Sequence, residues 1–195
     1  MSACKHRPRA PAAALAPGAA ILAACAALAA ASAAVAAPAS RPPADGTSGK
    51  PTAAQRALLH SHELWATIDV CDPRDQPDTV GVRGSMPGDG DAHDRMYMSF
   101  RLQYEGASGQ WLDLSSTTGG WVAVGGSSSP RQGGSSFDLK PAQGKPPVTL
   151  RGVVDFQWRR GKRVLANATR TTAAGHKSLA GADPKDFSAA TCVIG

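Results

Sequence analysis

The sequence predicts an all-β fold, an antiparallel sandwich of about seven or eight strands, and three observations lead to this prediction. Two long segments alternate apolar and polar residues with a period of two, which is typical of strands that bury one face. Several shorter apolar segments are joined by Gly, Pro, Asp and Ser, the residues that favour turns. Few segments have helical periodicity, so two sheets that each bury one face on the other explain the pattern best.

The clearest predicted strand covers residues 96–104. Its apolar positions recur at every second residue, and they are Met96, Met98, Phe100, Leu102 and Tyr104. A second long strand is predicted over residues 148–158, where the apolar face ends with Phe156 and Trp158. A basic stretch with Gly161 near its centre follows. Because glycine readily takes the positive φ of a tight turn, we expect a hairpin there.

Shorter strands complete the predicted sheets. Each is a short apolar or alternating run between turn residues, and in chain order they cover residues 64–71, 79–86, 110–114, 121–124, 135–139 and 164–171. The glycine-rich segments at 119–120 and 125–134 are expected to be loops. A folding unit of residues 64–195 is long enough to bury one core, so we expect a single domain.

Residues 1–37 have the pattern of a signal peptide. Basic side chains near the start precede an alanine-rich apolar run, residues 10–37, that ends in small residues. We therefore expect the mature protein to be secreted. In an alternative interpretation, residues 22–25 form a lipobox, and a lipidated Cys25 holds a lipoprotein on the outer face of the membrane. An uncleaved anchor is a third interpretation, which the low hydropathy of alanine disfavours.

Residues 38–63 are expected to form a disordered linker. They are rich in Pro, Ala, Gly, Ser and Thr and contain too few large apolar side chains to build a core. Residues 52–64 have the composition of a short helix, but no apolar repeat indicates that this helix would pack against the domain.

Two cysteines, Cys71 and Cys192, lie near the two ends of the folding unit. In an oxidising compartment such a pair most simply forms a disulfide, which we expect to join the first strand to the last segment. Closing a loop of this length lowers the entropy of the unfolded chain, and in the chain-entropy model it contributes about 5 kcal/mol. A metal site built on the two thiols is the alternative, but the clusters of further ligands that it requires are missing.

A resemblance follows from the signal peptide, the Ala- and Pro-rich linker and a long alternating strand that ends near Phe156 and Trp158. In these features the chain resembles secreted actinobacterial proteins with a single fibronectin-III-like or immunoglobulin-like domain. The resemblance covers residues 64–195 and departs from antibody domains, because Cys71 and Cys192 lie at the domain ends. It implies a binding or structural module of the cell surface and carries over no catalytic residues. The function we expect first is that of a secreted or cell-surface, non-enzymatic module with a structural, adhesive or binding role.

Charge is distributed unevenly along the folding unit. Residues 64–113 contain four arginines against nine acidic residues, a net charge of −5, whereas residues 114–195 contain eleven basic against four acidic residues, a net charge of +7. The densest basic cluster is the hairpin, with Arg159, Arg160, Lys162 and Arg163. Outside a cell, a cell-wall polymer or a polysaccharide is a more suitable partner for it than nucleic acid. The alternative is a charged hairpin tip that keeps a sheet edge soluble.

Two tryptophans, Trp111 and Trp121, suggest an alternative function, a carbohydrate-binding module. Flat aromatic rings suit stacking on sugars, although tryptophans in a sandwich also serve as core residues. A small secreted hydrolase is a further alternative. The sequence offers it little support, because no Gly-x-Ser-x-Gly motif is present and the folding unit contains one glutamate, Glu105.

No cofactor is predicted, and the metal candidates are weak. Asp89, Asp91 and Asp94 lie in one loop and could offer oxygen ligands to calcium, yet the EF-hand spacing is absent and aspartate is common in turns. His93 and His176 are isolated loop histidines, and zinc requires three or four ligands that converge.

Overall fold

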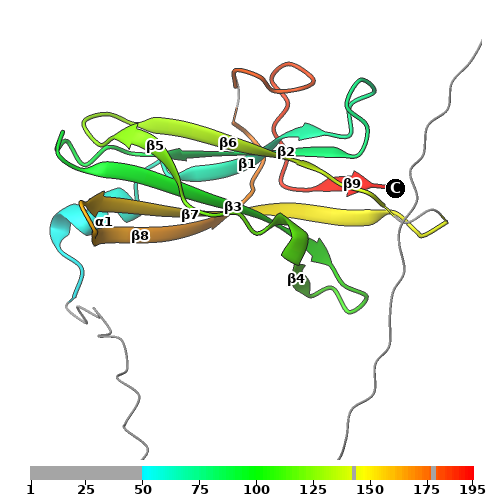
Figure 1. The fold of residues 1–195 in the computed structure, drawn as a ribbon, viewed down its shortest axis with the longest axis horizontal. Coiled ribbons are helices and arrows are strands. Elements are labelled where there is room, and N and C mark those ends of the chain that lie inside the picture. The colour runs from blue at the N-terminus through cyan, green and yellow to red at the C-terminus, as the bar shows by residue number, and fades with distance from the viewer. Residues whose placement is uncertain (1–49, 142–143, 177–178) are drawn as a thin grey trace, which may run out of the picture. The chain divides into compact units, whose positions relative to one another are not determined.

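Two antiparallel sheets packed face to face form the domain (Figure 1), which confirms the all-β sandwich. The computed structural model describes residues 50–141, 144–176 and 179–195. The expected signal peptide, residues 1–37, and the lipidation candidate Cys25 lie outside these described residues. No helix in the described ranges is long and apolar enough to cross a membrane.

The smaller sheet contains three strands in the order β1-β2-β6. These strands are β1 (Trp65–Cys71), β2 (Thr79–Met86) and β6 (Arg131–Asp138). The central strand β2 is antiparallel to both neighbours.

The larger sheet contains six strands, with β4, β3, β7 and β8 along its main path. In chain order the six are β3 (Arg95–Glu105), β4 (Trp111–Asp113), β5 (Val122–Gly126), β7 (Val148–Arg160), β8 (Arg163–Thr171) and β9 (Cys192–Ile194). Strand β5 pairs with the first half of β3, β4 pairs with its end, and β9 pairs with the start of β7. The pairing of β3 with β7 is continuous from Arg95 opposite Arg159 to Tyr104 opposite Leu150.

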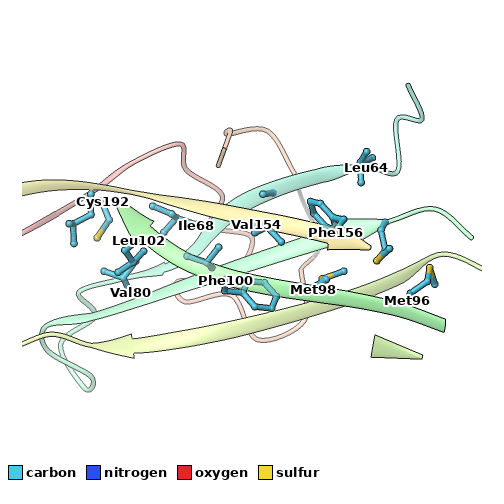
Figure 2. Close-up of a cluster of buried hydrophobic side chains, with 14 of the residues drawn as sticks. Leu64, Ile68, Val80, Met96, Met98, Phe100, Leu102, Val154, Phe156 and Cys192 are labelled. Carbon is cyan, nitrogen blue, oxygen red and sulfur yellow. The ribbon is translucent and has the colours of Figure 1, made fainter. Parts of the chain in front are cut away.

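The core lies between the two sheets, where the period-two alternation predicts it. Figure 2 shows Met96, Met98, Phe100 and Leu102 in succession along β3, and all four are buried. On β7, Trp158 is fully buried, and its indole Nε1 donates a hydrogen bond of 2.9 Å to the carbonyl oxygen of Pro87. The predicted alternation of β3 and β7 therefore decides which face of the larger sheet is buried and which is open.

Gly152 allows the two sheets to approach closely at the centre of β7. A Cβ atom at this position would lie 2.7 Å from the side chains of Val82 and Thr172. This distance is shorter than a van der Waals contact, so a larger residue would push the sheets apart.

The described part of the chain contains nine strands, against the seven or eight that the sequence predicts. Strand β6 begins at Arg131, inside the glycine-rich segment expected to be a loop, because Gly133 lets β6 pack closely on the side chain of Val124. Strand β9 is too short to show an alternation, and its pairing with β7 and the bond at Cys192 hold it in place.

The expected disulfide is present between Cys71 and Cys192. Cys71 ends β1 in the smaller sheet, and Cys192 begins β9 in the larger sheet. The bond therefore joins the two layers of the sandwich, as well as the first strand and the last.

A short helix, α1 (Ala53–Leu59), precedes the sandwich within the stretch expected to be a linker. Thr52 and Gln55 form a capping box at its start, which satisfies two free backbone N–H groups. The helix contacts the domain, because Leu58 packs against the core and the Gln55 amide donates to the backbone oxygen of Leu165 in β8. The part of the chain that packs into the domain thus begins before Leu64. The sequence did not predict this, because one apolar residue without a repeat does not indicate packing.

Residues 172–176 and 179–191 cover the free edge of β1, the strand that ends the three-stranded sheet. Thr67 and Asp69 point away from the core and are nevertheless buried. The covering segment exchanges two backbone hydrogen bonds between Ile68 and Ala189. In addition, Arg83 binds Asp69 at 2.7 Å and donates to the backbone oxygen of Ala180.

Candidate functional site

The outer face of the larger sheet carries the candidate site, and we call it the outer face below. Its side chains come from positions that alternate with the core residues, so the register of β3, β4, β7 and β8 brings them into one surface. The side chains used below are Tyr97, Arg101, Gln103, Trp111, Asp113, Trp121, Arg151, Asp155, Gln157, Arg159, Asn167 and Thr169.

An arginine bound by two carboxylates lies at the centre of the outer face. The Arg101 guanidinium pairs with Asp155 on β7 and, at 3.3 Å, with Asp113 on β4. The hydroxyl of Thr169 on β8 donates to Asp155 at 2.5 Å. Four neighbouring strands are thereby linked by hydrogen bonds between side chains.

Gln103 extends this network toward β4. Its amide nitrogen donates to Asp113 at 2.8 Å, and this bond, together with the charge of Arg101, lowers the pKa of Asp113 below its ordinary value. Asp113 is therefore ionised at neutral pH and acts as an acceptor, not as a proton donor.

Trp111 forms one end of the outer face. The guanidinium carbon of Arg151 lies 4.3 Å from the centre of the Trp111 ring, and Arg151 Nε donates to the side-chain oxygen of Gln103 at 2.8 Å. Partial burial lowers the pKa of Arg151, but arginine remains charged at any physiological pH. The indole is half-buried, so part of the ring is open to solvent.

Trp121 forms the other end with the same types of partner. The Arg159 guanidinium carbon lies 5.0 Å from the centre of the Trp121 ring and 4.3 Å from that of Tyr97. Arg159 Nε donates to the side-chain oxygen of Gln157 at 2.7 Å. Trp121 is 41% exposed, so its ring is among the large apolar surfaces open to solvent.

The two tryptophans lie far apart along β3. Trp111 is opposite Glu105, whereas Trp121 precedes Val122, which is opposite Met98. This difference in register of about six residues separates the two rings by roughly 20 Å along the strand.

A shallow hollow of about 260 Å³ lies beside Trp121 on the outer face. Its polar lining comes from Asp155, Gln157, Asn167 and Thr169, so donors and acceptors surround one edge of the exposed ring.

The basic hairpin does not form one binding surface. Arg160 points away from the outer face and binds Asp94 at 2.6 Å, and it also pairs with Asp91. Arg159 lies on the outer face over aromatic rings, and Lys162 and Arg163 are exposed at and beside the turn. Gly161 takes φ +57° in this turn, as the sequence predicts. Of the four basic residues, only Arg159 thus belongs to the candidate site.

The acidic loop that contains Asp89, Asp91 and Asp94 lies beside Arg160. Asp91 and Asp94 both bind Arg160, and the Asp89 carboxylate accepts a hydrogen bond from the backbone nitrogen of Asp91. Across the described part of the chain, no three His, Cys, Asp or Glu side chains converge in a way that would hold a metal ion.

The two loop histidines lie apart from the outer face. His93 is exposed and contacts Asp91 at 3.0 Å. His176 stacks on Trp65 at 4.1 Å between ring centres, and burial lowers its pKa.

A larger apolar hollow, of about 420 Å³, opens at the end of the sandwich near β9. It is lined by Tyr104, Leu114, Ser116, Leu139, Lys140, Pro141, Val148, Leu150 and Ile194. Among these described lining residues there is no carboxylate or imidazole, so they include no acid–base pair of the kind that hydrolysis commonly uses.

Sequence reasoning identified both tryptophans and Arg159 but missed Arg101, Arg151 and their partners. The signal was available, because polar residues alternate with the core residues of β3 and β7, but only the strand register shows which of them meet. Comparisons of the chain with models of protein families, with curated proteins and with solved structures gave no match.

Proposed function

We propose that this protein is an extracellular, non-enzymatic carbohydrate-binding module, and that the outer face is its binding surface. One observation carries the proposal. An uncovered sheet face presents two partly exposed tryptophans, Trp111 and Trp121, with an ordered row of hydrogen-bonding side chains between them.

The chemistry of the outer face suits a sugar chain. The solvent-exposed parts of the two indole rings provide apolar surface for the C–H groups of a pyranose beside the arginine that lies over each ring. Side-chain amides and carboxylates provide partners for its hydroxyl groups. Arg101, Gln103 and Asp113 already hold one another in place. A ligand would therefore meet a preorganised surface, which lowers the entropy cost of binding.

The same network argues against hydrolysis on this face. Asp113 and Asp155 are both paired with Arg101, and the lowered pKa of Asp113 keeps that carboxylate ionised at neutral pH. A glycosidase that uses two carboxyl groups needs one of them protonated as the general acid.

The extracellular location rests on two independent features. The leader has the pattern of a signal peptide, with lipidation at Cys25 as the alternative, and the Cys71–Cys192 disulfide is of the kind that persists in oxidising compartments. A polysaccharide or another cell-wall polymer is then an accessible partner.

The order of the strands supports the proposed immunoglobulin-like or fibronectin-III-like class. Strands β1, β2 and β6 form one sheet, and β3, β7 and β8 are consecutive neighbours in the other. This arrangement corresponds to a three-stranded A-B-E layer facing a C-F-G layer in immunoglobulin-type sandwiches.

Binding to immobilised polysaccharides tests the proposal. We expect the purified domain to bind at least one polysaccharide of a panel. The double variant Trp111→Ala/Trp121→Ala should bind about tenfold more weakly or worse, since tryptophans that become covered by a ligand contribute a large share of binding energy. The matched control is Leu112→Ala/Val122→Ala, in which each change lies one residue away and both side chains are exposed. Equal losses in the two double variants, or binding to no polysaccharide, would contradict the proposal.

A further inference from the structure

We infer that the outer face selects acidic polysaccharides, polymers whose sugars carry carboxylates. This inference rests on the proposed function and names the ligand class within it. It follows from a group of three side chains that occurs twice on the outer face.

The repeated group consists of a tryptophan, an arginine that lies over its ring and a glutamine that holds the arginine. The first unit is Trp111, Arg151 and Gln103, and the second is Trp121, Arg159 and Gln157. In both, Arg Nε donates to the glutamine oxygen, at 2.8 Å in the first unit and 2.7 Å in the second. Ring and amide together fix the plane of each guanidinium.

Neither Arg151 nor Arg159 forms an ion pair with a carboxylate of the described residues, whereas Arg101 between them pairs with two. In each unit Nε donates to a glutamine. The two terminal nitrogens of the guanidinium are then the donors that a ligand would meet. A planar guanidinium with two adjacent donors matches a carboxylate in bidentate geometry. A neutral hydroxyl group can accept a hydrogen bond from the guanidinium but forms no ion pair with it, so the interaction is weaker.

The local charge differs between the two ends. Arg95 lies opposite Arg159 across the β3–β7 pair and adds a second positive charge at the Trp121 end. Glu105 lies opposite Trp111 and adds a negative charge at the other end. We therefore expect the Trp121 end to contribute more to the attraction of an anionic chain.

The spacing of the two units favours a polymer over a single sugar. Arg151 and Arg159 lie on the same strand, β7, and eight residues separate them by roughly 26 Å. A ligand that engages both must span this distance and carry repeated carboxylates. Binding of the second unit is then intramolecular, which raises the apparent affinity of a long chain.

The ligand-side experiment compares polygalacturonate with the same polymer after its carboxylates have been reduced to primary alcohols. We expect the wild-type domain to bind polygalacturonate about tenfold or more tightly, the difference expected for charge-assisted hydrogen bonds. Equal binding of both polymers, or binding of neutral polysaccharides without polygalacturonate, would overturn the acidic selectivity and leave the proposed function standing. If no polysaccharide binds at all, both proposals fail.

The protein-side experiment uses two double variants that remove the same charge. Arg151→Gln/Arg159→Gln removes the guanidinium groups of the two units, whereas Lys162→Gln/Arg163→Gln removes two charges at the hairpin. We expect the first to weaken polygalacturonate binding about tenfold or more and the second to change it little, provided that thermal melting shows both to be folded. An equal effect of the hairpin variant would overturn the inference, because attraction would then depend on net charge alone.

Discussion

The buried carboxylate of Asp94 receives two hydrogen bonds from Arg160, at 2.6 Å from Nε and 2.9 Å from a terminal nitrogen. Asp94 immediately precedes β3 and Arg160 ends β7, so the pair fixes the β7–β8 hairpin to the start of β3. Because neighbouring residues of a strand point to opposite faces, anchoring Arg160 on one side holds Arg159 on the other, over Tyr97 and Trp121.

Asp94→Ala is therefore expected to lower the melting temperature more than Asp91→Ala does. The Asp94 side chain is 3% exposed and that of Asp91 is 38% exposed, so the two carboxylates pair with the same arginine in different surroundings. Ion pairs at the surface contribute little to folding stability. A buried carboxylate such as that of Asp94 depends on its hydrogen-bond partners to offset the cost of burying its charge, so the pair contributes more to holding the two segments together. Differential scanning calorimetry measures both, and equal melting temperatures would show that the Asp94 pair does not anchor the hairpin.

Loss of the disulfide should lower the free energy of unfolding by about 5 kcal/mol in the chain-entropy model. The bond closes a loop of 121 residues and joins the two sheets. Urea unfolding of the wild type with and without reductant measures the difference. Cys71→Ala/Cys192→Ala in the absence of reductant is the independent check. An unchanged unfolding midpoint after confirmed reduction would contradict the expected stabilisation.

Trp158→Phe should lower the free energy of unfolding by about 2 kcal/mol or more, because it leaves a buried carbonyl without its donor and a smaller ring in the core. The lost bond is the one from Trp158 to Pro87. Trp121→Phe is the matched control, and we expect it to stay within about 0.5 kcal/mol of the wild type, since that ring is exposed. Similar losses in both variants, measured by urea unfolding, would contradict this assignment of core and surface.

Stability should fall as the pH drops below 6.5, in part because of His176. Burial against Trp65 lowers the pKa of His176 from its ordinary value of 6.5. The unfolded chain therefore binds a proton in a pH range where the folded chain does not, and protonation favours unfolding. Melting temperatures across this range should decline less in His176→Gln than in the wild type. Parallel declines would show that other groups cause the acid sensitivity.

The long alternating strands and the disulfide were predictable because each depends on a strong local pattern. Met96 to Leu102 alternate with polar residues over most of β3, and Cys71 and Cys192 were the only cysteines of the folding unit. Strand β9 and the contact of α1 were not predictable in the same way. Their positions depend on tertiary contacts, such as that of Gln55 with Leu165, which carry no periodic signal.

The candidate site was predictable in part for a related reason. Trp111 and Trp121 stand out by residue type, but their pairing with Arg151 and Arg159 depends on strand register, and a shift of one residue would move each side chain to the opposite face. The basic hairpin was misleading because its charges alternate between two faces, so that Arg160 binds the acidic loop.

The indole N–H signals of the four tryptophans provide the most direct test of the outer face as the binding surface. In a two-dimensional ¹H–¹⁵N titration with polygalacturonate, we expect the signals of Trp111 and Trp121 to shift and those of Trp65 and Trp158 to stay in place. Trp65 lies in the smaller sheet and Trp158 in the core, so they report on other parts of the domain. Shifts at Trp65 with none at Trp111 or Trp121 would place the ligand elsewhere and contradict the proposed site.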